Sequence, residues 1–253
     1  MNINLLFNDF CKVLQNCKQI LTEDSIRYYF YGCMLRQDSF FYDYTMELPY
    51  QEIATNKSLP ISLIPNHGLF YNSYKQKGGG MRTQLNQELD LYYNNGTECY
   101  CIEVKFHHDS PNSEYAHSSA AGELFNDIRR LQTIVSSSGR PIRKFLMYVA
   151  DDIMWTYLSG KPSGINNQKA KAQFQSFIKP DPKININLTY PQNSREDDSK
   201  SFWKAASKSF TVKNSDLNAV LQVIGADDFP TACPSMLNCG KGGYCHIRMY
   251  EIL

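Results

Sequence analysis

The chain has 253 residues, a formal net charge of +1 at pH 7 and a composition that is 42% hydrophobic. Such a chain can bury a sizeable core, as one large domain or as two small ones. The near-neutral charge excludes a general nucleic-acid coat, so any contact with DNA has to be local. We find no signal peptide and no apolar stretch long enough to span a bilayer. We therefore expect a cytoplasmic protein with reduced cysteines and no membrane partner.

A helix and a strand are the first elements that the sequence predicts. Thr22 can cap a helix that continues to Leu35, because apolar side chains recur at the three-and-four spacing of a buried face. Residues 40–50 predict a strand that ends near Pro49. Its alternating pattern places Glu47 on one face and four apolar or aromatic side chains on the other: Tyr42, Tyr44, Met46 and Leu48.

Residues 88–106 predict two strands joined by a turn at Asn95-Gly96, which is a strong hairpin signal. With a two-residue turn Asp90 faces Cys101, and with a longer loop Asp90 faces Glu103. Side chains alternate along a strand, so both registers place the same charged residues on one face. That face carries three acids and one base: Glu88, Asp90, Glu103 and Lys105.

This group of charges has a chemical interpretation and a structural one. Like charges so close repel each other, and burying them without compensation costs several kcal/mol. A hard divalent cation such as Mg²⁺ removes the repulsion, prefers carboxylate oxygens and keeps water for chemistry. A lysine beside it can orient that water for attack on a phosphodiester. The alternative is a solvated hairpin face that carries a Glu–Lys cross-strand pair.

Further elements follow along the chain. Residues 113–135 predict a helix with an apolar stripe, and residues 144–150 predict a strand covered on both sides. The pattern after residue 150 is weaker, but besides a possible helix around residues 170–177 it predicts four further elements. These are a short helix at 151–158, a strand at 184–188, a helix at 215–223 and a terminal strand at 245–253.

The order helix, strand, strand, strand, helix, strand, with Asp90 followed by Glu103-Val104-Lys105, resembles the PD-(D/E)XK nuclease superfamily. The resemblance covers about residues 22–150, roughly half of the chain. It implies an α/β fold with a restriction-endonuclease-like core, in which helices flank a central mixed sheet. We assign residues 1–150 to this core and residues 151–253 to a C-terminal α+β extension packed on it.

The resemblance also implies a role for individual residues. Lys105 corresponds to the catalytic lysine, and Glu47 competes with Glu23 for the role of a supporting acid. Leu89 departs from the family pattern, in which a proline precedes the first acid. The implied metal ligands are the carboxylates of Asp90, Glu103 and Glu23 and the backbone carbonyl of Val104.

The expected function is that of a Mg²⁺-dependent DNA endonuclease, with Mn²⁺ able to substitute. Duplex DNA is the favoured substrate, and because duplex cleavage cuts two strands we expect a homodimer. A role in prokaryotic restriction or phage defence is implied by the resemblance alone. Two alternatives remain open: a nuclease-fold module that binds DNA or protein without turnover, and a nuclease that acts on RNA or single strands.

Two basic patches and one possible zinc site complete the candidates. Lys75, Lys77 and Arg82 flank a glycine triplet just before the acidic hairpin, and a second patch runs from Arg129-Arg130 to Lys144. Each can contact DNA or form an ordinary solvated surface. Four residues are zinc ligands by type, although they lack the paired spacing of structural sites: Cys233, Cys239, Cys245 and His246.

Overall fold

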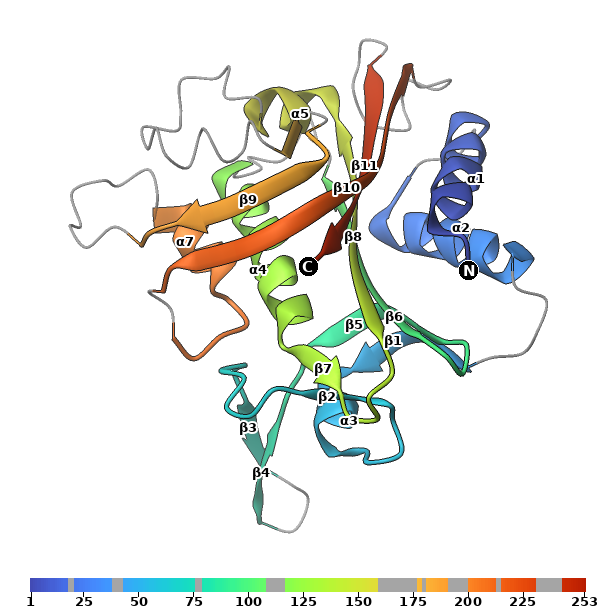
Figure 1. Ribbon diagram of the computed structural model, residues 1–253. Coiled ribbons are helices and arrows are strands. Elements are labelled where there is room, and N and C mark those ends of the chain that lie inside the picture. Colours follow the sequence, from blue (N-terminus) through green and yellow to red (C-terminus); the bar gives the residue numbers. More distant parts are fainter. Residues whose placement is uncertain are drawn as a thin grey trace.

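One mixed sheet of seven strands forms the centre of this computed structural model. Figure 1 shows how the strands and the surrounding helices are arranged. The spatial order of the strands is β1 (Asp43–Pro49), β5 (Glu88–Asn94), β6 (Cys99–His107), β8 (Ile142–Asp151), β11 (Tyr244–Ile252), β10 (Leu217–Pro230) and β9 (Lys183–Leu188). The structure describes residues 1–17, 21–37, 43–75, 79–107, 117–158, 177–178, 181–190, 200–212, 215–230 and 243–253. The chain is thus an α/β protein with a central mixed sheet.

Neighbouring strands of this sheet run antiparallel, except for β6 and β8, which run parallel. A parallel pair needs a crossover connection, and helix α4 (His117–Gln132) lies within it. The sheet continues without a break past residue 150, because β11 pairs with β8 from Cys245↔Asp151 to Glu251↔Phe145.

Helices cover both faces of the sheet. α1 (Ile3–Gln15) and α2 (Glu23–Gln37) pack on one face of the sheet, where they contact Ile102, Val104 and the other strand side chains of that face. On the opposite face lie α4, α5 (Asp152–Leu158) and α7 (Lys200–Ala206), as Figure 1 shows. Strands buried on both faces read as nearly continuous apolar runs, which is the pattern of β8.

A small substructure is inserted between β1 and β5. It contains α3 (Tyr50–Thr55), β2 (Ile61–Leu63) and a hairpin of β3 (Asn72–Lys75) and β4 (Met81–Gln84). β2 pairs with β7 (Ile134–Ser136), which follows α4. None of the helices in the described ranges combines the length and apolarity needed to cross a membrane.

The hairpin adopts the longer-loop register of the two that the sequence allows. Tyr93 pairs with Tyr100 and Leu91 with Ile102, so Asp90 approaches Glu103 rather than Cys101. Asn95 fixes the turn, because its side-chain oxygen accepts hydrogen bonds from the backbone amides of residues 97 and 98. The predicted cap of α2 is also confirmed, since Thr22 Oγ1 accepts a hydrogen bond from the amide of Ser25.

Some predicted bounds differ from the structure, and one predicted alternation of side chains is wrong. The strand expected at 40–50 ends at Pro49, its first residues 40–42 lie outside the described residues, and Tyr50 begins α3. Leu48 packs with the α4 side of the sheet and not with Met46, because Glu47 has a φ of 54° and breaks the alternation. The helix expected at 113–135 ends at Gln132, because the residues that follow Gln132 form strand β7 and pair with β2.

The helix expected at residues 215–223 is also wrong, because this segment belongs to strand β10. Its buried side chains Leu217, Ala219 and Leu221 alternate with more exposed ones, which is the period of a strand. The strands β9 and β11 hold it on both sides. The short helix and the strands expected at 184–188 and 245–253 correspond to α5, β9 and β11.

Candidate active site

The candidate site lies where strands β5 and β6 stop pairing. Their ladder runs from Asn94↔Cys99 to Leu91↔Ile102. One residue beyond it, the backbone amide of Val104 donates a hydrogen bond of 2.7 Å to Oδ2 of Asp90. The carboxylate of Asp90 is therefore held against β6, between Glu103 and Lys105 in the sequence of that strand.

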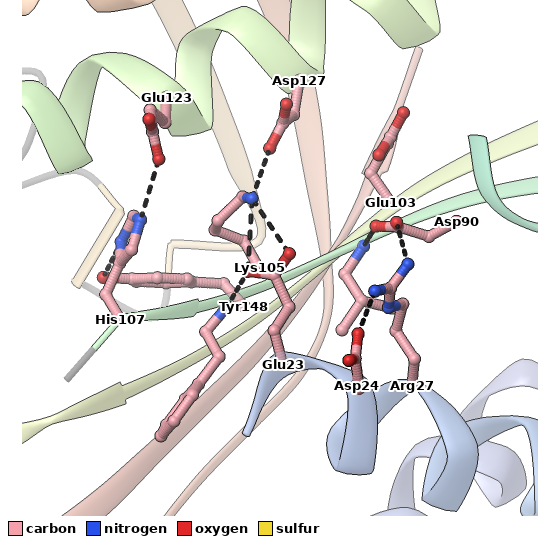
Figure 2. Close-up of polar contacts among 12 residues, drawn as sticks. Glu23, Asp24, Arg27, Asp90, Glu103, Lys105, His107, Glu123, Asp127 and Tyr148 are labelled. Atoms are coloured by element: carbon pink, nitrogen blue, oxygen red, sulfur yellow. Dashed lines mark hydrogen bonds and ion pairs between the residues drawn. The ribbon is translucent and has the colours of Figure 1, made fainter. Parts of the chain in front are cut away.

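Helix α2 supplies an acid and a base to this point, as Figure 2 shows. Arg27 donates a hydrogen bond of 3.0 Å to the other oxygen of Asp90, and it also contacts Asp24 and Glu47. One turn earlier, Oε2 of Glu23 accepts a weak hydrogen bond of 3.4 Å from the amide of Phe106. The first turn of α2 is thereby tied to the end of β6.

Helices α3 and α4 hold Glu103 from the opposite face of the sheet. Arg130 of α4 donates a hydrogen bond of 2.8 Å to its Oε2, and the hydroxyl of Tyr50 in α3 donates one of 3.3 Å to its Oε1. The same arginine binds Asp127, one helical turn earlier, at 2.9 Å. Glu103 is only 1% exposed, so its charge depends on these partners.

Lys105 lies between helices α2 and α4 (Figure 2). Its Nζ lies 3.3 Å from both carboxylate oxygens of Glu23 and 3.7 Å from Oδ2 of Asp127. We call Glu23, Asp90, Glu103, Lys105 and Asp127 the acidic site. The predicted residues Asp90, Glu103, Lys105 and Glu23 are thus neighbours in space, although they come from three elements.

Burial and charge shift the titration of these groups. Burial raises the pKa of Asp90 and raises that of Glu103 well above its usual range, and the negative charge of Asp90 adds to the shift of Glu103. Burial alone would lower the pKa of Lys105, but the carboxylates of Asp127 and Glu23 outweigh it and raise that pKa. Lys105 is therefore an ammonium group at neutral pH.

The site contains more acid than base. Arg27, Lys105 and Arg130 are the cations, and they contact six carboxylates: Glu23, Asp24, Glu47, Asp90, Glu103 and Asp127. Oδ2 of Asp127 is buried and accepts no hydrogen bond within the described part of the chain. An excess of oxygen donors over positive charge suits a hard divalent cation.

The side chains are not arranged as a ready metal cage. Across the described ranges, no three acidic, imidazole or thiol groups converge closely enough to hold a metal ion. Asp90 and Glu103 each face an arginine instead. Mg²⁺ needs only one or two protein carboxylates and keeps several waters, so an ion at Asp90 or Glu103 would have to replace the arginine that each acid contacts.

The remaining candidates separate into those near the site and those away from it. Of the two rival supporting acids, Glu47 is 55% exposed and contacts Arg27, whereas Glu23 contacts Lys105. Glu88 reaches the site only with its backbone carbonyl, which accepts a hydrogen bond from Arg130. Arg130 belongs to the second predicted basic patch, but its side chain is only 12% exposed and is paired with Glu103 and Asp127, which leaves it little available to DNA.

Of the four predicted zinc ligands, Cys233 and Cys239 lie outside the described residues, and Cys245 and His246 lie on β11. Cys245 is buried on the α1 side of the sheet. The two ring nitrogens of His246 lie 2.8 and 2.9 Å from the carboxylates of Asp228 and Asp152. Cys245 and His246 thus point to different surroundings, as expected for adjacent strand residues.

Sequence reasoning missed several residues of the site, namely Arg27, Tyr50, Asp127 and Arg130. Asp127 carried a usable signal, because it lies on the stripe formed by Ala120, Leu124 and Leu131 at helical spacing. A charge within an apolar stripe needs a buried partner. The arginines and Tyr50 carried no comparable signal, since the strand acids that they bind, Asp90 and Glu103, are distant from them in sequence.

Searches against protein-family models, curated protein sequences and solved structures returned no match to this chain.

Proposed function

We propose that the chain is a Mg²⁺-dependent endonuclease that hydrolyses DNA phosphodiester bonds, with Mn²⁺ able to replace Mg²⁺. The observation that carries the proposal is the position of Lys105. Its ammonium group contacts Glu23 and Asp127 at the point where Asp90 and Glu103 leave the β5–β6 ladder. This combination of acids and a lysine at a strand end is the pattern on which the resemblance to the PD-(D/E)XK superfamily rests.

The order of the elements supports a restriction-endonuclease-like core. α2, β1, β5, β6, α4 and β8 follow each other as helix, three antiparallel strands, helix and a strand parallel to the third. The inserted α3 and β2–β4 lie between the first and second of these strands. An insertion there leaves the relative positions of Asp90, Glu103 and Lys105 unchanged, because they depend on the β5–β6 pair.

Each residue that corresponds to the family pattern has a role in the proposal. Asp90, Glu103 and the carbonyl of Val104 would hold the metal ion, and Glu23, or Glu47 in its place, would support it. When bound there, Mg²⁺ would supply a water of lowered pKa and would offset the charge that grows on the scissile phosphate. Lys105 orients the attacking water and stabilises negative charge.

The charge state of Lys105 limits its chemistry. A lysine whose pKa is raised by Asp127 and Glu23 is a poor proton acceptor at neutral pH. It is a good hydrogen-bond donor and a fixed positive charge. The proposal therefore assigns it positioning and electrostatic stabilisation, and not proton abstraction.

Plasmid cleavage tests the proposal. Supercoiled DNA should be cut in Mg²⁺ and left intact in EDTA, and Asp90→Asn, Glu103→Gln and Lys105→Gln should each reduce the rate about 100-fold or more. Glu98→Gln is a matched control, because Glu98 lies at the turn of the same hairpin, where it accepts a hydrogen bond from Tyr100. Variants of the acidic site that fold normally and cut as fast as this control would contradict the assignment.

Arg130 provides a second test that does not depend on cleavage. Arg130→Gln leaves Glu103 buried without its cation, and breaking such a pair costs about 3–5 kcal/mol. In EDTA the variant should therefore unfold at lower urea than wild type. Mg²⁺ should restore more stability to it than to wild type, because the ion occupies the place of the lost charge. An equal response of both proteins to Mg²⁺ would contradict metal binding at Glu103.

The pairing of Asp90 and Glu103 with arginines favours one alternative, a nuclease-fold module that binds DNA or protein without turnover. In that case DNA is retained but never cut, whichever divalent cation is present. A panel of duplex DNA, single-stranded DNA and RNA separates these possibilities and identifies an RNA or single-strand nuclease. A homodimer belongs to the main proposal, because cutting both strands of a duplex requires two sites.

A further inference from the structure

The β3–β4 hairpin is a two-stranded ribbon that projects from the body of the protein beside α3, at the bottom of Figure 1. Its strands pair from Asn72↔Gln84 to Lys75↔Met81. Met81, Arg82 and Thr83 are all exposed, so this ribbon buries little of β4 against the core. A two-stranded ribbon without a packing face of its own is marginal in water and gains stability from a partner.

A groove of about 330 Å³ separates the ribbon from α3. The described side chains that line it can all form hydrogen bonds, and none of them is acidic or aliphatic. They are Gln51 and Thr55 of α3 and Arg82, Thr83 and Gln84 of β4. Arg82 is exposed and forms no ion pair with any acid in the described ranges, so its guanidinium is available to a ligand.

Local hydrogen bonds hold this groove in shape. Oε1 of Gln51 accepts a hydrogen bond of 3.0 Å from the amide of Leu85, which fixes the end of β4 to α3. The hydroxyl of Thr55 donates to the carbonyl of Gln51 one turn earlier. With its oxygen engaged, Gln51 has its amide NH₂ group left as a donor.

The groove is connected to the acidic site through α3. Tyr50, which directly precedes Gln51, donates a hydrogen bond to Glu103, and its backbone amide donates to the carbonyl of Gln87. Residues 85–87 lead from β4 into β5 and hence to Asp90. A ligand in the groove therefore lies beside α3, whose Tyr50 binds Glu103, and beside β4, from which the chain leads to Asp90.

The chemistry of the groove suits base edges better than phosphates. Among the described side chains that line the groove, one arginine accompanies two amides and two hydroxyls, whereas a phosphate site concentrates positive charge. Lys77 and the side chain of Lys75, the other members of the predicted basic patch, lie outside the described part of the chain. Arginine pairs with the acceptors of guanine and glutamine pairs with adenine, and the major groove of B-DNA admits a two-stranded β-ribbon. Side chains on such a ribbon can reach base edges directly.

We propose that the β3–β4 ribbon enters the major groove of duplex DNA, where Arg82 and Gln84 contact base edges and so set the sequence that is presented to the acidic site. This inference rests on the proposed function, because it takes DNA as the substrate. It adds the part of the protein that selects the sequence, and its prediction concerns binding and not turnover.

Binding without cleavage tests it. In EDTA, wild type, Arg82→Ala, Arg82→Lys and Gln84→Ala are each bound to a pool of labelled duplexes with a randomised central segment, and the retained duplexes are sequenced. Wild type should enrich a sequence that contains a guanine which Arg82→Ala no longer prefers, and the affinity for that sequence should fall about 10-fold or more. Arg82→Lys should keep most of the charge but lose the preference, since lysine lacks the two-pronged guanidinium.

Arg36→Ala is the matched control, because Arg36 is exposed at the end of α2, away from the ribbon. It should leave affinity and preference unchanged. The inference is overturned if Arg82→Ala binds like this control. It is also overturned if affinity falls equally for all sequences with a salt slope reduced by about one, which is the mark of a phosphate contact. Selective retention of RNA would overturn it as well.

The two proposals fail in different ways. A wild-type protein that selects a duplex sequence in EDTA but never cuts it in Mg²⁺ contradicts the endonuclease and supports the ribbon. Cleavage that depends on Lys105 but is indifferent to Arg82 and Gln84, in binding as in cutting, supports the endonuclease and contradicts the ribbon.

Discussion

Glu123 on α4 is a residue whose titration links three parts of the fold. Lys208 donates a hydrogen bond of 2.8 Å to one of its oxygens, and Nε2 of His107 on β6 lies 3.9 Å from the other. Interaction with His107 and then with Lys208 lowers the pKa of Glu123 from its ordinary value of 4.5 to about 2. The folded protein therefore takes up this proton less readily than the unfolded chain.

The sign of the resulting pH dependence follows from that shift. Above pH 4.5 the carboxylate stabilises the fold, and this contribution is lost as the pH falls from 4.5 toward 2. The full shift is worth about 3 kcal/mol, and a side chain that is partly exposed retains about 1–2 kcal/mol after screening. Glu123→Gln should thus be less stable than wild type by this amount at pH 7, and as stable near pH 2. Urea unfolding across that range measures the difference, and Lys208→Met should show part of it.

At the scale of residues, the sequence was most informative where a charge interrupts an apolar pattern. Asp90, Glu103 and Lys105 stand within strands that are otherwise buried, and they are neighbours in the structure. Asp127 interrupts a helical stripe in the same way. Arg130 could not be assigned to Glu103 from the sequence, because their pairing depends on how α4 lies across the sheet. That angle is set by tertiary packing, for which a single sequence holds no local signal.

At the scale of elements, local patterns predicted β5, β6 and β8 well but failed for β10. The segment Leu217–Val223 has apolar side chains at most positions, so both periods fit it. Pairing with β9 and β11 decides in favour of a strand. The break in β1 at Glu47 was likewise invisible, because a positive φ at a residue other than glycine or asparagine has no sequence signature.

Two glycines within helices allow a test of how α4 is positioned. A Cβ at Gly122 of α4 would lie 2.8 Å from Cβ of Ala205 and 3.0 Å from the amide nitrogen of Ala206, both on α7. A Cβ at Gly32 of α2 would meet nothing within 4 Å. The same substitution therefore has opposite consequences in the two helices.

Gly122→Ala should lower the free energy of unfolding by about 1–3 kcal/mol, because α4 has to move away from α7. Gly32→Ala should raise it by about 0.5–1 kcal/mol through its better helix propensity. Urea denaturation measures both. Since α4 also carries Asp127 and Arg130, Gly122→Ala should reduce activity at the acidic site, whereas Gly32→Ala should not. Equal effects of the two substitutions would show that the close contact between α4 and α7 is absent.

At the scale of the whole molecule, the C-terminal strands complete the sheet that carries the acidic site. β11 separates β8 from β10, and its side chains Ile247 and Met249 are fully buried with those of β8 on the α1 side. The sequence predicted the terminal strand itself. Its insertion next to β8 could not be predicted, because an antiparallel partner can add to any free edge of a sheet.

Removing residues 151–253 tests whether the N-terminal part folds alone. The fragment 1–150 would expose the edge of β8, whose residues Phe145 to Ala150 are fully buried in the intact chain. A long apolar edge without a partner favours aggregation over a stable fold. We expect the fragment to lack near-UV circular dichroism and a cooperative urea transition, and we expect residues 151–253 added in trans to restore both. A fragment 1–150 that unfolds cooperatively near the midpoint of the full chain would contradict this, and would make the core an independent domain.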